Sequence, residues 1–172
     1  MVNNMAMVDR ALGGGTEVET LRFLHGLIHY MQPKVIVEAG TCRGDFVTYA
    51  RFACPSAEIF TADIFKHKWT DDLEKDATFF LGDFEKMLRE LLRGREIDFA
   101  FIDSGPPPVL LPPQLEAGVR LRHYDAVKPY MSEGGIIVTH DTEKTDWDGA
   151  TSIISDADIQ FNCGRGLTLR QI

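Results

Sequence analysis

Five acidic side chains each stand at the end of a short apolar run of the sequence: Glu38, Asp63, Asp83, Asp103 and Asp141. If the runs are parallel strands, their carboxyl ends meet at one edge of the sheet, where open α/β sheets bind ligands. Carboxylates at that edge could accept hydrogen bonds from the hydroxyl and amino groups of a ligand, or hold a cation. Capping of the following helices accounts for one or two of these acids and not for all of them.

The turn after the first apolar run, VEAGTCRGDF, narrows the choice of ligand. Gly40 lets the backbone leave the strand, and Gly44 lets a helix and a ligand approach closely. The middle glycine of a pyrophosphate-binding loop is missing, because Cys42 stands there. Glu38 and Asp45 flank the turn and would repel a pyrophosphate. The turn therefore argues against a dinucleotide and suits a ligand that carries an ammonium and a sulfonium.

Two histidines are candidate bases at this edge, because imidazole titrates near neutral pH. His140 precedes Asp141 at the end of the fifth apolar run, and His123 opens the segment HYDAV. The alternative for His140 is a hydrogen-bonded side chain that lines the sheet edge. The alternative for His123 is a residue on the surface of a helix.

The elements that must position these side chains alternate along the chain. Short apolar, β-branched runs predict strands, and apolar residues at helical spacing predict helices between them. Thr16 and Glu19 form a T-x-x-E pattern, which predicts a capping box at the start of the first helix. The expected strands are 34–38, 57–63, 77–83, 97–103, 134–141, 158–162 and 166–172, and the expected helices are 16–31, 45–53, 84–93, 114–131 and 149–156.

This alternation predicts a doubly wound, Rossmann-like α/β fold. Its seven-stranded sheet is mostly parallel and ends in a C-terminal antiparallel hairpin, joined at Gly164 and Gly166. We expect a single domain at residues 16–172, preceded by a flexible segment at residues 1–15. The same segment and residues 104–123 are left to form any lid over the site.

The composition excludes several classes of protein. The 172 residues include 18 basic and 26 acidic side chains, for a net charge of −8, which argues against a nucleic-acid partner. Three cysteines without CxxC spacing indicate reduced thiols rather than a disulfide framework or a zinc site. No apolar run is long enough for a membrane span, and the first residues show no targeting pattern. We therefore expect a cytoplasmic protein with no membrane partner.

The motifs resemble those of class I S-adenosylmethionine-dependent methyltransferases. E-x-G-x-x-x-G after the first strand looks like the first motif of that family, and GDF at residues 82–84 is similar to the segment that contacts adenine. DFAFIDS, followed by HYDAVKPYMSEGGIIVTHDT, resembles small-molecule O-methyltransferases of the catechol-like and sugar- or antibiotic-modifying groups. The likeness covers about residues 16–172. It implies methyl transfer from S-adenosylmethionine to a small-molecule acceptor, at a hydroxyl oxygen.

The resemblance also implies roles for the residues at the strand ends. Glu38 would bind the amino group of the cofactor, Asp63 its ribose hydroxyls and Asp83 its adenine amino group. The backbone of the glycine turn would lie against the methionine part, and Phe84 or Ile64 would line the adenine ring. The expected cofactor residues are Glu38, Gly40, Thr41, Gly44, Asp63, Ile64, Asp83, Phe84 and Asp103.

A magnesium ion is a further expectation from the catechol-like group, where acids after the fourth and fifth strands hold the metal and it lowers the pKa of the acceptor hydroxyl. Asp103 and Asp141 match two of those positions. Thr142 stands where an acid or amide usually provides the third ligand, and SGPPP replaces the lysine base of that group. The metal site is therefore left open.

Two other functions remain open at this point. One is a protein that binds S-adenosylmethionine and has lost catalysis, and the other is a nicotinamide-dependent oxidoreductase. A homodimer, in which a partner subunit could extend the site, is also left open.

Overall fold

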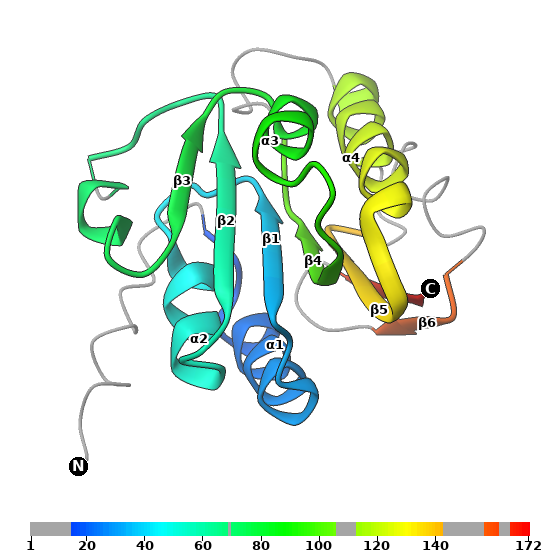
Figure 1. Ribbon diagram of the computed structural model, residues 1–172. Coiled ribbons are helices and arrows are strands. Elements are labelled where there is room, and N and C mark those ends of the chain that lie inside the picture. Colours follow the sequence, from blue (N-terminus) through cyan, green and yellow to red (C-terminus); the bar gives the residue numbers. More distant parts are fainter. Residues whose placement is uncertain (1–14, 69, 106–112, 143–156, 162–165) are drawn as a thin grey trace.

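The computed structural model describes residues 15–68, 70–105, 113–142, 157–161 and 166–172. Its strands form one sheet in the order β3-β2-β1-β4-β5-β7-β6 (Figure 1). β1 to β5 pair in parallel, and β7 pairs antiparallel with both β5 and β6. The predicted fold class is confirmed. The strands are Val35–Ala39 (β1), Glu58–Asp63 (β2), Thr78–Leu81 (β3), Ile97–Ile102 (β4), Met131–His140 (β5), Ile159–Phe161 (β6) and Leu167–Gln171 (β7).

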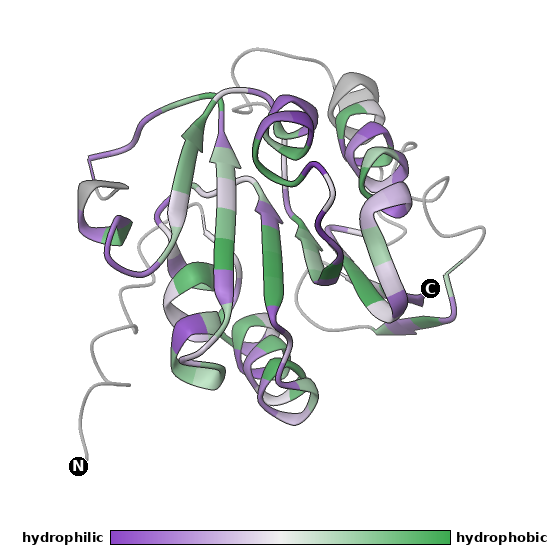
Figure 2. Cartoon of the chain, viewed as in Figure 1, coloured by the Kyte–Doolittle hydropathy of each residue, from purple (hydrophilic) through white to green (hydrophobic). Residues whose placement is uncertain are grey.

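Helices cover both faces of the sheet (Figure 1). They are Val18–Met31 (α1), Asp45–Ala53 (α2), Phe84–Leu91 (α3) and Pro113–Val127 (α4), with short 3-10 turns at Thr70–Leu73 (η2) and Lys128–Tyr130 (η3). α1 and α2 pack on one face, and α3 and α4 pack on the other. Figure 2 shows that apolar residues concentrate in the central strands, which both helix layers cover.

Each face of the sheet has its own apolar core, because successive residues of a strand point to opposite sides. Phe99 and Phe101 of β4 join the core under α1 and α2. Ala100 and Ile102 of the same strand join the core under α3 and α4. The two residues that follow β4 continue this alternation. Asp103 contacts Thr16 and His140, whereas Ser104 contacts His123 of α4 on the opposite face.

The predicted capping box at Thr16 and Glu19 is wrong. α1 begins only at Val18, and the side chain of Glu17, which precedes it, makes no capping hydrogen bond. The Thr16 hydroxyl instead donates to Oδ2 of Asp103, at 2.8 Å. A hydrogen bond to a carboxylate is stronger than one to a neutral backbone group. The contact across the sheet edge therefore replaces the local cap.

The helix predicted to end at Met131 stops at Val127. A 3-10 turn follows, because Pro129 has no N–H for a helical hydrogen bond. Met131 is instead the first residue of β5, three residues before the predicted start of that strand. The other boundaries of the described elements differ from the prediction by at most two residues.

Several predictions concern residues outside the described ranges. They are the helix at 149–156, the hairpin turn at Gly164, nearly all of the segment at 1–15 and the proline-rich part of the expected lid. Among the residues that the structure does describe, no helix is both long enough and apolar enough to cross a membrane.

Candidate active site

The turn between β1 and α2 closes as its glycine spacing predicts. Gly40 and Gly44 have φ angles of +98° and +76°, in the left-handed region that favours glycine. A Cβ on Gly40 would lie 2.5 Å from the carbonyl oxygen of Asp103, and a Cβ on Gly44 would lie 2.3 Å from the Leu73 side chain. Both positions therefore require glycine, and the turn packs directly against the residue that follows β4.

Asp63 orients this turn from the neighbouring strand. Its Oδ2 accepts a hydrogen bond from the backbone N–H of Cys42 at 2.8 Å, and its Oδ1 accepts one from the N–H of Phe65 at 3.0 Å. Each carboxylate oxygen has two lone pairs, so both oxygens can accept a further bond from a ligand. The next side chain, Ile64, is 57% exposed and presents an apolar surface beside Asp63. The end of β2 thus offers a ligand an acceptor and an apolar contact.

Glu38 lies within β1 and is buried. The Thr61 hydroxyl donates to its Oε2, and Thr61 in turn shares a hydrogen bond with the hydroxyl of Thr41. Burial raises the pKa of Glu38 well above its usual range, although the Thr61 hydrogen bond works in the opposite direction. Burial therefore favours the protonated form of Glu38.

Asp83 and Phe84 make structural contacts at the start of α3. Asp83 is the N-cap of α3, where its Oδ1 accepts from the backbone N–H of Glu85 at 2.9 Å. Its Oδ2 accepts from Arg122 at 2.7 Å. Phe84 is 2% exposed, and its ring packs against His123 with centroids 5.3 Å apart. Asp83 thus caps α3, while 41% of its side chain stays exposed, and its contact with an adenine amino group stays a prediction. Phe84 lies in the core of the α3–α4 face, and its place beside the adenine ring likewise stays a prediction.

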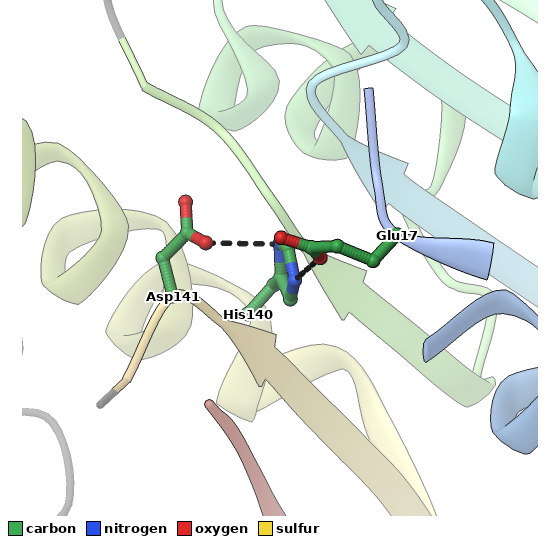
Figure 3. A group of neighbouring side chains, drawn as sticks. All are labelled: Glu17, His140 and Asp141. Atoms are coloured by element: carbon green, nitrogen blue, oxygen red, sulfur yellow. Dashed lines mark hydrogen bonds and ion pairs between the residues drawn. The ribbon is translucent and has the colours of Figure 1, made fainter. Parts of the chain in front are cut away.

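His140, the last residue of β5, is fully buried and lies among carboxylates, of which Figure 3 shows those of Glu17 and Asp141. Its Nε2 lies 2.7 Å from Oε2 of Glu17, which precedes α1. Its Nδ1 lies 2.9 Å from Oδ1 of Asp103 and 3.3 Å from Oδ1 of Asp141. Residues from the start of α1 and the ends of β4 and β5 thus meet at one imidazole ring.

These contacts keep the His140 ring charged. Burial by itself would lower the pKa of His140, but Asp103, Glu17 and Asp141 outweigh it and raise the pKa to about 10. For Asp103, burial would by contrast raise the pKa. The cationic His140 and Arg120 and the hydrogen bond from Thr16 outweigh burial and hold the pKa of Asp103 below its usual value. A protonated ring whose nitrogens both face carboxylates has no lone pair to accept a proton. The arrangement argues against the predicted role of His140 as a base.

Arg120 pairs with Asp141 beside this cluster. Its Nη2 donates to Oδ2 of Asp141 at 2.7 Å, and both side chains are 7% exposed. Arg120 shares the buried stripe of α4 with His123, Tyr124 and Val127, at helical spacing. That spacing is a signal in the sequence that would have identified Arg120 as a buried cation.

Asp103 and Asp141, the predicted metal ligands, do not suit Mg²⁺ in this arrangement. Glu17, His140 and Asp141 do offer ligand atoms within 4.8 Å of one another. However, Arg120 already lies against Asp141, and the two nitrogens of His140 face Glu17 and Asp103. Mg²⁺ requires a near-octahedral oxygen shell at about 2.0–2.1 Å. To build that shell, the ion would have to displace the cations of the chain.

A second group of potential ligands, Asp83, Glu85 and His123, lies at the start of α3 and on α4. Arg122 again occupies it, with Nη2 2.7 Å from Asp83 and Nε 2.7 Å from Glu85. This group is therefore an ion-pair network around an arginine.

His123 lies on α4 and is buried beside the end of β4, on the face of the sheet that α3 and α4 cover. This burial excludes the alternative of a residue on the surface of a helix. Its Nδ1 lies 2.7 Å from Oγ of Ser104, the residue after Asp103. Burial lowers the pKa of His123, and the nearby Asp83 carboxylate offsets this only in part. At neutral pH the ring is therefore uncharged, and its Nε2, which lies 3.3 Å from the donor Nη2 of Arg122, is the accepting nitrogen in this arrangement.

Sequence reasoning missed four side chains of this site: Thr16, Glu17, Ser104 and Arg120. Ser104 follows Asp103 directly, so its place at the sheet edge was readable from the sequence. Thr16 and Glu17 were assigned to the first helix and its cap, and no local pattern shows that they reach the ends of β4 and β5.

Solved methyltransferase structures share this fold. The O-methyltransferase of Bacillus cereus in complex with S-adenosylhomocysteine has a TM-score of 0.69 and 12% identity, with 98% of this chain and 88% of that chain covered. TomG, the O-methyltransferase of Streptomyces achromogenes involved in tomaymycin synthesis and solved with S-adenosylmethionine, has a TM-score of 0.68 and 16% identity, with 90% and 80% covered. At these identities the likeness concerns the fold alone.

The sequence itself also matches a family model. No curated protein matches the sequence. However, the model of a family described as a methyltransferase domain matches residues 37–142, more than half of the chain, from within β1 to just after β5. The predicted resemblance is confirmed, and the chain belongs to this methyltransferase-domain family.

Proposed function

We propose that this chain transfers the methyl group of S-adenosylmethionine to a hydroxyl oxygen of a small-molecule acceptor. The observation that carries the proposal is the glycine turn after β1, which lies between Glu38 and Asp63 at the carboxyl edge of the sheet. It allows close backbone approach and places an acid on each side. Oxygen as the acceptor atom is supported by the structural relatives from Bacillus cereus and Streptomyces achromogenes, which are O-methyltransferases.

In this proposal the cofactor lies across the ends of β1 and β2. The backbone from Gly40 to Gly44, with Thr41 between them, lies against the methionine part, and Glu38 gives up its proton to pair with the ammonium group. Asp63 accepts the ribose hydroxyls, and the exposed Ile64 side chain lies against the adenine ring. Asp103 lies next to Gly40 and contributes negative charge near the sulfonium.

The acceptor would react on the side of β4 and α4. Its hydroxyl oxygen bonds to the methyl carbon while the carbon–sulfur bond breaks, and the bonding electrons pass to sulfur to leave S-adenosylhomocysteine. The acceptor proton passes through the Ser104 hydroxyl to Nδ1 of His123, 2.7 Å away, once the ring carries its own proton on Nε2 and Arg122 has turned away from that nitrogen. His123 is thus the proposed base, and positioning by the fold supplies much of the acceleration.

Binding of S-adenosylhomocysteine tests the proposal without knowledge of the acceptor. In isothermal titration calorimetry, Asp63→Ala should weaken binding by about 1.5–3 kcal/mol, because it removes charged acceptors from the ribose hydroxyls. Asp125→Ala is the control, since Asp125 is an exposed acid near the C-terminal end of α4, where it pairs with Lys128. Equal affinity in wild type and Asp63→Ala would contradict the cofactor assignment, as would binding of NAD in place of S-adenosylhomocysteine.

A further inference from the structure

The carboxylates at the ends of β4 and β5 already face cations that belong to the chain. Asp103 accepts from Thr16 through Oδ2 and faces His140 through Oδ1. Asp141 accepts from Arg120 through Oδ2, and its Oδ1 lies 3.3 Å from His140. Three of the four oxygens of the two aspartates therefore take part in a hydrogen bond. The fourth, Oδ1 of Asp141, lies in an ion pair with His140, and neither it nor the buried Oγ1 of Thr142 has a hydrogen-bond partner among the described residues.

Arg120 supplies one positive charge of the chain to these carboxylates. Its guanidinium pairs with Asp141, and the ring of His140 lies between Glu17 and Asp103. Arginine remains charged at any pH that a protein experiences, so this charge does not depend on a titration.

Arg120 also keeps a donor in reserve. Its Nη2 binds Asp141, whereas its buried Nε has no hydrogen-bond partner among the described residues. Buried N–H groups are almost always paired in folded proteins. An unpaired guanidinium N–H at the end of β5 therefore points to a ligand oxygen that completes the site.

We propose that Arg120 takes the place of a divalent metal, so that methyl transfer by this chain needs none. The inference rests on the proposed function. Arg120 Nε–H donates to the acceptor oxygen as it loses its proton, which is the stabilisation that a metal ion gives elsewhere. Asp141 holds the guanidinium in place. His140 is a positioning residue, because it acts through Asp103 and Asp141.

Manganese serves as the probe, because Mn²⁺ binds the same oxygen ligands as Mg²⁺ and free Mn²⁺ is visible by electron paramagnetic resonance. We expect the wild-type chain to leave the Mn²⁺ signal unchanged up to about 1 mM, a concentration that occupies even weak carboxylate sites. Arg120→Met removes the guanidinium from Asp141 and should raise Mn²⁺ affinity at least about tenfold, together with a Mn²⁺-dependent rise in Tm. Arg95→Met is the matched control, since Arg95 pairs with Glu58 at the surface, and it should bind no more Mn²⁺ than the wild type.

Uptake of Mn²⁺ by the wild type, abolished by Asp141→Asn, would overturn the inference. So would an Arg120→Met chain that folds and still binds no Mn²⁺. If Arg120→Met does not fold, the Mn²⁺ titration of the wild type and of Asp141→Asn still shows whether the site binds a metal. Calorimetry with S-adenosylhomocysteine on the same wild-type sample separates the two proposals. Absence of binding overturns the methyltransferase function, whereas binding together with Mn²⁺ uptake overturns only the metal-free site.

Discussion

The two buried histidines at the carboxyl edge of the sheet respond to burial in opposite ways. His140 is 0% exposed and His123 is 5% exposed, and for each of them burial is the largest influence on the pKa and acts to lower it. At His140, carboxylates lying 2.7, 2.9 and 3.3 Å from the ring nitrogens reverse that influence. At His123 the nearest carboxylate, Asp83, is 3.7 Å away, and burial prevails. The charges in contact with an imidazole therefore decide its state more than the depth at which it lies.

Because of this difference in protonation, the two histidines have different roles at the site. His140, on the α1–α2 side, carries a proton that it cannot give up near neutral pH, so it acts as a fixed positive charge. His123, on the α3–α4 side, is uncharged and bonded to Ser104, so it can take up a proton. The same residue type thus serves as counter-ion on one face and candidate base on the other.

The largest expected effect comes from removing the fixed charge. His140→Gln leaves Asp103 and Glu17 without their cation, and breaking a buried pair in this way costs about 3–5 kcal/mol of unfolding free energy. Urea denaturation at pH 7 measures the loss. His25→Gln is the control, because His25 makes one hydrogen bond to the carbonyl of Tyr49 and has no carboxylate partner among the contacts that the structure describes. Equal losses in the two variants would mean that the charge of His140 contributes nothing.

The second effect is alkaline destabilisation of the wild type. The pKa of His140 is raised from about 6.5 to about 10 in the folded chain. Its contribution is fully present below pH 6.5 and is lost as the pH rises through the folded value. Linkage predicts a loss of about 2–3 kcal/mol between pH 7 and pH 9. The same urea titrations at both pH values test this, and His140→Gln should flatten the dependence. An unchanged slope in the variant would assign the alkaline loss to another group.

A smaller effect, of opposite sign in pH, is expected at His123. His123→Gln disturbs the buried hydrogen bond to Ser104 and should cost about 1–2 kcal/mol at pH 7. Because the pKa of His123 is lowered in the folded chain, the unfolded chain binds a proton first as the pH falls below 6.5. The wild type should therefore lose stability in mild acid, and the variant should lose less. Parallel acid limbs in the two unfolding curves would show that His123 is not held neutral.

The smallest effect is expected at a surface ion pair that matches Arg120 and Asp141 in distance but not in burial. Arg95 lies 2.6 Å from Glu58, with side chains 42% and 59% exposed, against 2.7 Å and 7% for the buried pair. Arg95→Met should change the free energy of unfolding by less than about 1 kcal/mol, because water screens exposed pairs. Thermal unfolding of Arg95→Met beside Arg120→Met makes the comparison. A larger loss from Arg95→Met would contradict the importance of burial.

The order of the elements and the place of the site were readable from the sequence. Alternating apolar strands and amphipathic helices are encoded over a few residues, and parallel strands bring their carboxyl ends to one edge. Glu38, Asp63, Asp103 and Asp141 lie at that edge as predicted, and the glycine turn has the expected positive φ angles. The spacing of residues in α4 also indicates which face of that helix is buried, although Arg120 was not predicted to lie on that face.

The partners of these residues were not readable in the same way. Glu17 and His140 are 123 residues apart in the chain, and Asp103 and His140 are 37 apart, so no local pattern links them. Thr16 shows the limit directly, because its sequence context indicates a helix cap and its hydroxyl binds Asp103 instead.

By itself, then, the sequence determined the fold class, the family and the edge of the sheet where cofactor chemistry gathers, because these follow from local periodicity and short motifs. Only the tertiary structure decided which histidine is charged, which is neutral and whether the aspartates are free for a metal. Those properties depend on groups a few ångströms apart in space and far apart in the chain, since a charge interaction strengthens as the separation and the surrounding water decrease.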